Sequence, residues 1–208
     1  MNCVNDRELD EYIDRVIGAI SEDQLSELEQ SPYPYVVKIQ GKVKELIAQH
    51  RSSVFDTWLE QDKISCLPNY ALPAVISPTA FTSMVPKSLY TAEEDMNEYE
   101  FKVVWALSEL GNVKWWHRNI SRLGFQINGP VHAYPDIIVM LHSGKILMVE
   151  TKGDHLDNDE SKEKAKIGDQ WAKLAGKQYK YYMVFETKQP DYPGAYSLER
   201  FMEIVKEL

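Results

Sequence analysis

Tyr134-Pro-Asp-Ile-Ile-Val-Met-Leu-His-Ser-Gly-Lys-Ile-Leu-Met-Val-Glu-Thr-Lys-Gly153 is the stretch of sequence that decides the fold. Two apolar runs, 137–141 and 146–149, flank a short polar turn that ends in Gly144, a pattern typical of a β-hairpin. A three-residue loop of this kind usually places its glycine in the left-handed region, and that register sets Asp136 opposite Glu150. Strand side chains alternate with period two, so Glu150 and Lys152 share a face. We therefore expect two carboxylates and an ammonium at the open end of the hairpin.

Two carboxylates side by side on a hairpin repel each other, and cross-strand pairs normally avoid such an arrangement. A hard divalent cation such as Mg²⁺ removes this penalty, because it takes oxygen ligands and often binds through one or two carboxylates and substrate phosphate oxygens. Lys152 can then neutralise charge on a phosphate or orient a water for in-line attack. The pattern thus indicates Mg²⁺-assisted phosphoryl chemistry.

Pro135-Asp136, the hairpin and Glu150-Thr151-Lys152 together resemble the signature of the PD-(D/E)XK nuclease superfamily. The resemblance implies that Asp136 and Glu150 bind Mg²⁺ and that Lys152 assists phosphodiester hydrolysis. From about residue 67 to the C-terminus, further segments are similar, in the same order, to the C-terminal endonuclease region of type III restriction enzyme Res subunits. These segments are 86–90, 96–100, 116–119, 124–127, 134–136, 149–153 and 157–159, with Lys164 and Trp171 beyond them.

The resemblance also implies partners. Res subunits carry an ATP-driven helicase motor ahead of this region and work with a modification methyltransferase subunit. The Gly-Lys pairs at 41, 144 and 176 lack the upstream glycine of a phosphate-binding loop. We therefore expect the chain to be either a C-terminal fragment or a separate product that depends on such a motor. Two alternatives stay open: an inactive nuclease-like interaction module, and a nuclease in DNA repair or phage defence outside restriction.

The composition describes a globular chain with an acidic balance. Of 208 residues, 44% are hydrophobic and 26% are charged, and the net charge is -9. Residues 1–90 carry 13 acidic and 8 basic side chains (-5), and residues 91–208 carry 19 and 15 (-4). Proteins that bind DNA unaided usually present a basic face, because affinity rests on phosphate neutralisation. Tight independent binding of DNA is not expected.

Cys3 and Cys66 are far apart and belong to no Cys/His cluster with metal-ligand spacing, so we interpret them as free thiols in a reducing cytoplasm. The polar, acidic N-terminus is unlike a signal peptide. No apolar run approaches the ~20 residues of a membrane span. The sequence therefore predicts a cytoplasmic protein without a membrane segment.

Three parts are predicted along the chain. Residues 1–66 are mainly helical, with one helix from residue 6 to near Ser21, a second over 22–30 and a third from Val36 to Leu59. Four prolines mark residues 67–90 as an extended connector. Residues 91–208 form the nuclease domain.

In that domain the first predicted helix begins at an N-cap on Thr91 and ends near Leu110, before Gly111. Glu100 lies at the edge of the apolar stripe of this helix. In nucleases of the resembled kind, a glutamate on the first helix often reaches the metal, so Glu100 is a candidate accessory ligand. A rim glutamate in a salt bridge is the alternative, and Glu98 replaces Glu100 if the helical phase is shifted.

Val113–Asn119 resembles a strand that leads into a loop. Trp116, Arg118 and Asn119 are candidate nucleic-acid contacts, through stacking and phosphate binding. Trp115 is the tryptophan more readily assigned to the core. Residues 125–127 suggest a further short strand, and His132 and His155 are expected to make only local hydrogen bonds.

After the hairpin, residues 153–158 form the expected loop at the mouth of the site. A helix capped by Asp159 or Ser161 is predicted to run to Ala175. Lys164 lies on its inner face and is a candidate phosphate contact; equally, its alkyl chain covers the core while its amine reaches water. A strand over 178–185 and a helix over 198–208 follow. The order of elements predicts an α/β sandwich of the restriction-endonuclease-like type, with a central mixed sheet covered on both faces, because both hairpin strands are almost uniformly apolar.

Overall fold

The computed structural model describes residues 5–66, 68, 70–80 and 84–208, in two compact units, Met1–Ile64 and Ser65–Leu208. We call these unit 1 and unit 2. Cys3 lies outside the described residues, as do positions 67, 69 and 81–83 of the expected connector. None of the described helices combines the length and the apolar composition that a membrane span requires.

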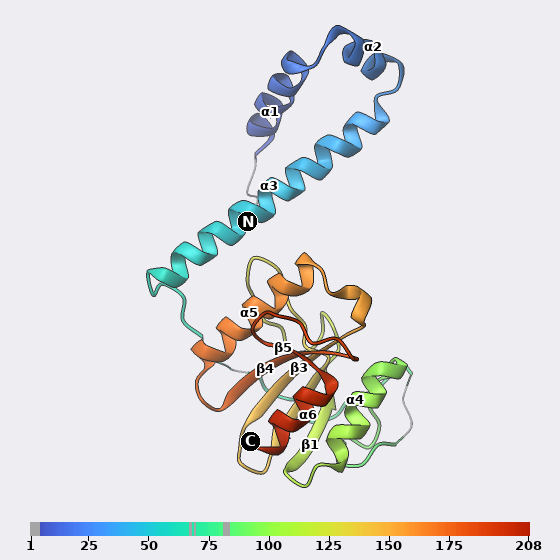
Figure 1. Cartoon of the computed structure of the whole chain (residues 1–208), viewed down its shortest axis with the longest axis vertical. Coiled ribbons are helices and arrows are strands. Elements are labelled where there is room, and N and C mark those ends of the chain that lie inside the picture. The colour runs from blue at the N-terminus through green and yellow to red at the C-terminus, as the bar shows by residue number, and fades with distance from the viewer. Residues whose placement is uncertain (1–4, 67, 69, 81–83) are drawn as a thin grey trace. The chain divides into compact units, whose positions relative to one another are not determined.

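Unit 1 is made of three helices, α1 (Asp6–Ala19), α2 (Glu22–Gln30) and α3 (Tyr33–Glu60) (Figure 1). Capping boxes at Asn5 and Ser21 begin the first two helices close to their predicted positions. The third begins three residues before the predicted Val36, because Pro34 lies in the first turn, where a backbone N–H is not needed.

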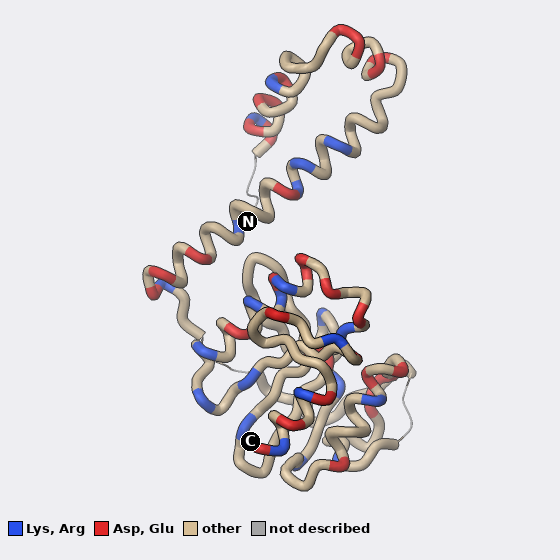
Figure 2. Tube along the Cα trace, in the orientation of Figure 1, with Lys and Arg blue, Asp and Glu red and all other residues tan. Residues whose placement is uncertain are grey.

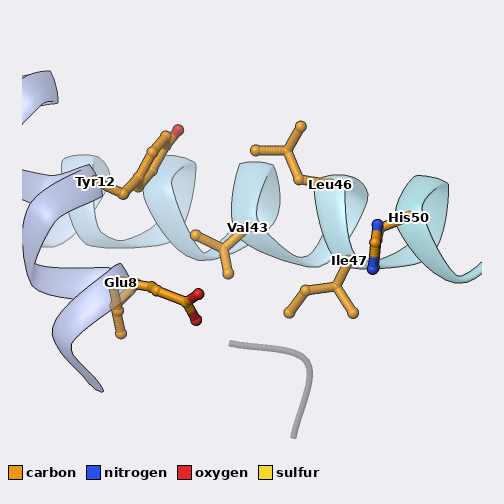
Figure 3. Close-up of a pocket in the computed structure, with 7 residues that line it drawn as sticks. Glu8, Tyr12, Val43, Leu46, Ile47 and His50 are labelled. Atoms are coloured by element: carbon orange, nitrogen blue, oxygen red, sulfur yellow. The ribbon is translucent and has the colours of Figure 1, made fainter. Parts of the chain in front are cut away.

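The helices of unit 1 bury little. Among the described residues of α1, α2 and α3, none is buried, and side chains such as Val36, Leu46 and Trp58 are exposed. Apolar side chains of α1 and α3 instead line an open hollow of about 390 Å³ (Figure 3). Because helices in proteins owe most of their stability to tertiary packing, unit 1 has little local stability of its own.

We expect hydrogen exchange followed by mass spectrometry to show this difference directly. Amides of α1–α3 should exchange much faster than those of the central strands of unit 2, since local opening of a helix without a buried face costs little free energy. Protection of α1–α3 equal to that of the strands would contradict this expectation and would mean that a partner covers their apolar side chains.

Unit 2 is built on one five-stranded mixed sheet in the order β1-β2-β3-β4-β5. The first three strands are antiparallel neighbours, and β4 and β5 continue in parallel. The strands are β1 (Val113–Arg118), β2 (Ile137–Leu141), β3 (Ile146–Lys152), β4 (Tyr179–Phe185) and β5 (Ala195–Ser197). The helices are α4 (Glu98–Glu109), α5 (Asp159–Ala175) and α6 (Leu198–Lys206), with a short 3-10 turn, η1 (Asp154–Leu156). This is the predicted α/β sandwich with helices flanking a central mixed sheet.

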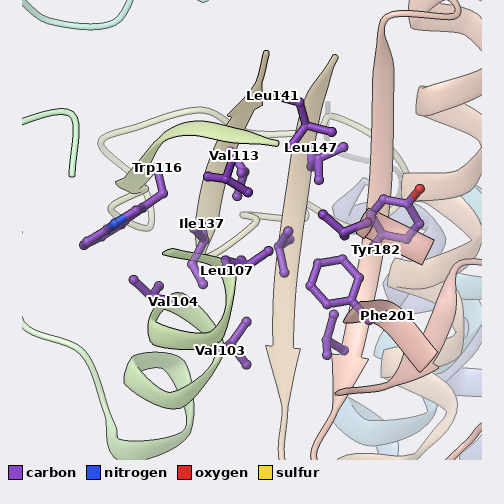
Figure 4. Close-up of a cluster of buried hydrophobic side chains, with 14 of the residues drawn as sticks. Val103, Val104, Leu107, Val113, Trp116, Ile137, Leu141, Leu147, Tyr182 and Phe201 are labelled. Atoms are coloured by element: carbon purple, nitrogen blue, oxygen red, sulfur yellow. The ribbon is translucent and has the colours of Figure 1, made fainter. Parts of the chain in front are cut away.

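Each face of the sheet is covered by its own layer. On one face, Val103, Val104 and Leu107 of α4 and Phe201 of α6 point towards the strands (Figure 4). On the other face, α5 packs Ala165, Ile167 and Trp171 against the sheet, together with Tyr70 and Leu72 of the segment that follows unit 1. Strand β2 and the apolar part of β3, residues 146–149, are therefore covered on both faces, as their composition predicts.

The hairpin has the predicted register. Gly144 has φ +84°, and the backbone N–H of Leu141 donates to the carbonyl of Lys145 at 2.9 Å. Ile137 pairs with Val149, so the next pair outward is Asp136 opposite Glu150. The fold thus brings the two carboxylates to one end of the sheet.

In unit 2, the starts of two helices and one predicted strand differ from the structure. Helix α4 begins at Glu98 and not near Thr91, because Asn97 and Glu100 form a reciprocal capping box. Helix α5 is capped by Asn158, whose side chain accepts from the N–H of Ser161. Residues 125–127 form only an isolated bridge, from Ile127 to Ala133, and not a strand.

Candidate active site

The open end of the β2–β3 hairpin holds the charge cluster that the sequence predicts. The Nζ atom of Lys152 lies 2.8 Å from Oε1 of Glu150. Asp136 is held from the next residue along β3, because Thr151 donates to its Oδ2 from the backbone N–H at 2.7 Å and from the hydroxyl at 2.8 Å. The sequence motif gives no role to Thr151, which makes it a residue that sequence reasoning missed.

Glu150 has one carboxylate oxygen without a hydrogen bond. Its side chain is only 6% exposed, and none of the described residues contacts Oε2 as a donor. A buried acceptor left unpaired is costly, because it has lost water without replacement. The donor set also suits a hard cation, since carboxylate oxygens are the ligands that Mg²⁺ prefers. The chemistry of Asp136 and Glu150 therefore fits a divalent cation.

Electrostatics at the cluster follow from burial. Burial, reinforced by the nearby Asp136 carboxylate, raises the pKa of Glu150 to about 7, although Lys152 acts in the opposite direction. Burial acts to lower the pKa of Lys152, but the carboxylates of Glu150, Asp136 and Glu160 together outweigh burial and the pKa is raised. Lys152 thus remains an ammonium, while Glu150 exchanges a proton near neutral pH.

A raised pKa of Glu150 makes stability depend on pH. The folded chain retains a proton that the unfolded chain has lost above its ordinary pKa of 4.5, so stability falls as pH rises towards about 7. Glu150→Gln removes this dependence. We expect the variant to gain roughly 3 kcal/mol relative to wild type between pH 4 and pH 8. Urea unfolding without divalent cations measures it, and a difference that stays constant with pH would contradict the assignment.

Arg118 joins two carboxylates from different elements. Its Nη2 lies 2.9 Å from Oε1 of Glu100 on α4, and its Nη1 lies 3.4 Å from Oδ1 of Asp136. Nη1 also donates to the backbone carbonyl of Asp136 at 2.9 Å. Glu100 is only 6% exposed, and burial raises its pKa against the influence of Arg118. Glu100 therefore joins the charge cluster through a salt bridge to an arginine, which is the alternative to a metal ligand that the sequence left open.

A buried pair behind Arg118 holds the end of β1. Glu93 accepts from the backbone N–H of Arg118 at 3.1 Å and from the hydroxyl of Ser88 at 3.0 Å, and its Oε2 lies 2.8 Å from Nδ1 of His117. Both Glu93 and His117 are buried. The predicted N-cap on Thr91 would place Glu93 in the first turn of a helix, whereas α4 begins only at Glu98, so the sequence did not predict this contact.

The predicted assignment of the two tryptophans is reversed. Trp116 is 0% exposed, and its Nε1 donates to the carbonyl of Pro86 at 2.8 Å, so its ring has no free face on which a base could stack. Trp115 points to the opposite side of β1 and is only half-buried. Because strand side chains alternate between the two faces, only one of two adjacent tryptophans can enter the α4 layer. The sequence favoured Trp115 for the core, whereas the structure buries Trp116.

Asn119 has a structural role where a nucleic-acid contact was predicted. It is 1% exposed, donates to the carbonyls of Phe125 and Pro135, and accepts from the N–H of Phe125 at 2.7 Å. Gly124 is required beside it, because a Cβ there would lie 2.1 Å from the Asn119 side-chain oxygen. The amide thus ties the 119–125 loop to the residue that precedes Asp136.

Asn119→Ala should consequently destabilise the fold. It leaves buried backbone groups of Phe125 and Pro135 unpaired, which we expect to cost about 3 kcal/mol in urea unfolding. Asn128→Ala, at an exposed turn, is the matched control and should change little. A folded, fully stable Asn119→Ala protein with weakened DNA binding would instead support the nucleic-acid role.

The remaining candidates are peripheral. Lys164 pairs with Glu160 at 2.7 Å on α5 and is near enough to lower the pKa of Glu150. His132 and His155 are exposed. Cys66 is a free thiol packed beside the α5 layer, and burial raises its pKa, which disfavours the thiolate that a nucleophile would need.

Within the described part of the chain, no group of three or more His, Cys, Asp or Glu side chains is already arranged to hold a metal ion. The hairpin itself contributes two carboxylates, Asp136 and Glu150, and Glu100 of α4 pairs with Arg118. The chain matches no known family model, no curated protein and no solved structure. Its function therefore has to be argued from this site.

Proposed function

We propose that unit 2 is a Mg²⁺-dependent endonuclease domain that hydrolyses phosphodiester bonds in DNA. The observation that carries the proposal is the buried, unpaired Oε2 of Glu150 beside Asp136 and Lys152. Such a cluster of one uncompensated oxygen, a second carboxylate and an ammonium is costly in an apolar sheet. A cation and a phosphate together would neutralise it.

In this proposal Asp136 and Glu150 are the metal ligands. Mg²⁺, when bound, would supply Lewis-acid polarisation of the phosphodiester. Two hydrogen bonds from Thr151 hold the Asp136 side chain in a fixed orientation. The side chain of Asp136 would therefore lose little conformational freedom on binding the cation. The Lys152 ammonium, kept charged by Glu150, stabilises negative charge that develops on the phosphate or orients the attacking water.

DNA binding in the proposal depends on a partner. Lysine and arginine are interspersed with aspartate and glutamate along the trace of unit 2 (Figure 2), and the net charge of the chain is -9. Arg118 and Lys164 are the proposed local contacts for phosphate. The wider grip on DNA is assigned to a helicase motor, and recognition to a modification methyltransferase subunit, as in a type III restriction system in the cytoplasm.

Nicking of supercoiled plasmid tests the catalytic part of the proposal. With Mg²⁺ at low salt, the full chain should nick DNA and EDTA should abolish the reaction. Lys152→Ala removes one charge-stabilising donor and should lower the rate about 100-fold or more. Lys162→Ala is the matched control, because this lysine is half exposed and lies on α5 beside Asp159.

Equal nicking by wild type and Lys152→Ala, in the isolated chain and again with the helicase and methyltransferase subunits and ATP, would reject catalysis by this site. A chain that is silent under both conditions but binds the other subunits would be an inactive interaction module. Nicking that neither ATP nor the methyltransferase subunit stimulates would favour a nuclease of repair or phage defence over one of restriction.

A further inference from the structure

The three carboxylates at the site differ in how many of their oxygens are already bonded. Both oxygens of Glu100 are used, Oε1 by Arg118 and Oε2 by the backbone N–H of Asn97 at 2.9 Å. Both oxygens of Asp136 have donors, Oδ1 from Arg118 and Oδ2 from Thr151. Glu150 alone keeps an unpaired oxygen. The protein itself therefore satisfies five of the six carboxylate oxygens.

Arg118 occupies the position between Glu100 and Asp136 that a second divalent cation would need. Two-metal nucleases hold their ions about 4 Å apart on bridging carboxylates. Here a guanidinium bridges the carboxylates instead, through two nitrogens at 2.9 and 3.4 Å. Its charge is permanent, since a guanidinium does not lose its proton in proteins.

The guanidinium is also firmly held. Besides the two carboxylates, it donates to the backbone carbonyls of Asp136 and Asn119, and the backbone N–H of Arg118 is bound by the buried Glu93. Displacing it would leave several partly buried groups unpaired at once, at a cost for each. A second ion could enter only by breaking these contacts.

We infer that the site takes a single divalent cation, on Asp136 and Glu150, and that Arg118 supplies the second positive charge in place of a second ion. The inference rests on the proposed function and deepens it. Glu100 is then a positioning residue that holds Arg118, and not a metal ligand. Arg118 faces the phosphate with a fixed charge that is independent of metal concentration and of pH.

Counting bound Mn²⁺ tests the inference without any measure of activity. The electron paramagnetic resonance signal of free Mn²⁺ gives the number of ions that the full chain binds. We expect about one ion for wild type, and an affinity at least about 10-fold weaker for Glu150→Gln. Arg118→Met uncovers Glu100 and Asp136 and should raise the number to about two. Arg200→Met, at an exposed pair on α6, is the control and should leave it at about one.

Arg118→Lys keeps the test decisive if the methionine variant fails to fold. One ammonium retains the charge but cannot reproduce the planar fork between two carboxylates. We expect about one bound Mn²⁺ and Mg²⁺-dependent nicking lowered about 10-fold or more. Two ions on wild type, or wild-type nicking by Arg118→Lys, would overturn the role of Arg118 alone. No bound Mn²⁺ on wild type at millimolar concentration would overturn the proposed metal site together with it.

Discussion

Repulsion between the Asp136 and Glu150 carboxylates is the constraint on which unit 2 depends. Neighbouring like charges at the end of a buried hairpin cost free energy, the more so because the surrounding sheet is apolar. The structure offsets that cost in different ways at the two residues. Asp136 receives two hydrogen bonds from Thr151 and faces Arg118, whereas Glu150 has Lys152 on one oxygen and an unpaired second oxygen. Oε2 of Glu150 is thus the carboxylate oxygen of this site that lacks a hydrogen-bond donor among the described residues.

Strand β1 and helix α4 each supply one charged side chain near Glu150, and each of these side chains is held by other contacts. Strand β1 ends in Arg118, which the buried Glu93–His117 pair anchors from behind. Helix α4 contributes Glu100 through its first turn, where the capping box with Asn97 fixes the side chain. Charge at the site is therefore preorganised by contacts that lie in the core or at a helix terminus, which in the proposed function would reduce the reorganisation needed on phosphate binding.

The two units differ in physical character. Unit 2 has apolar layers on both faces of its sheet, while the described helices of unit 1 bury no residue and leave apolar side chains exposed on α3. Exposed apolar faces of this kind mark protein contacts more often than they mark catalysis. The acidic balance of the chain agrees with the proposal that its grip on DNA comes from a partner.

The sequence by itself determined the hairpin, its register and the convergence of Asp136, Glu150 and Lys152, because these follow from period-two alternation and from a glycine turn, which are local rules. It also determined the sandwich, since uniformly apolar strands must be covered on both faces. Only the tertiary structure decided that Trp116 is buried, that Asn119 ties a loop, and that Arg118 lies between Glu100 and Asp136. Those outcomes depend on contacts between residues that are distant in the chain. Alternation places Trp115 and Trp116 on opposite faces of β1, but only the layers packed on those faces decide which of the two is buried.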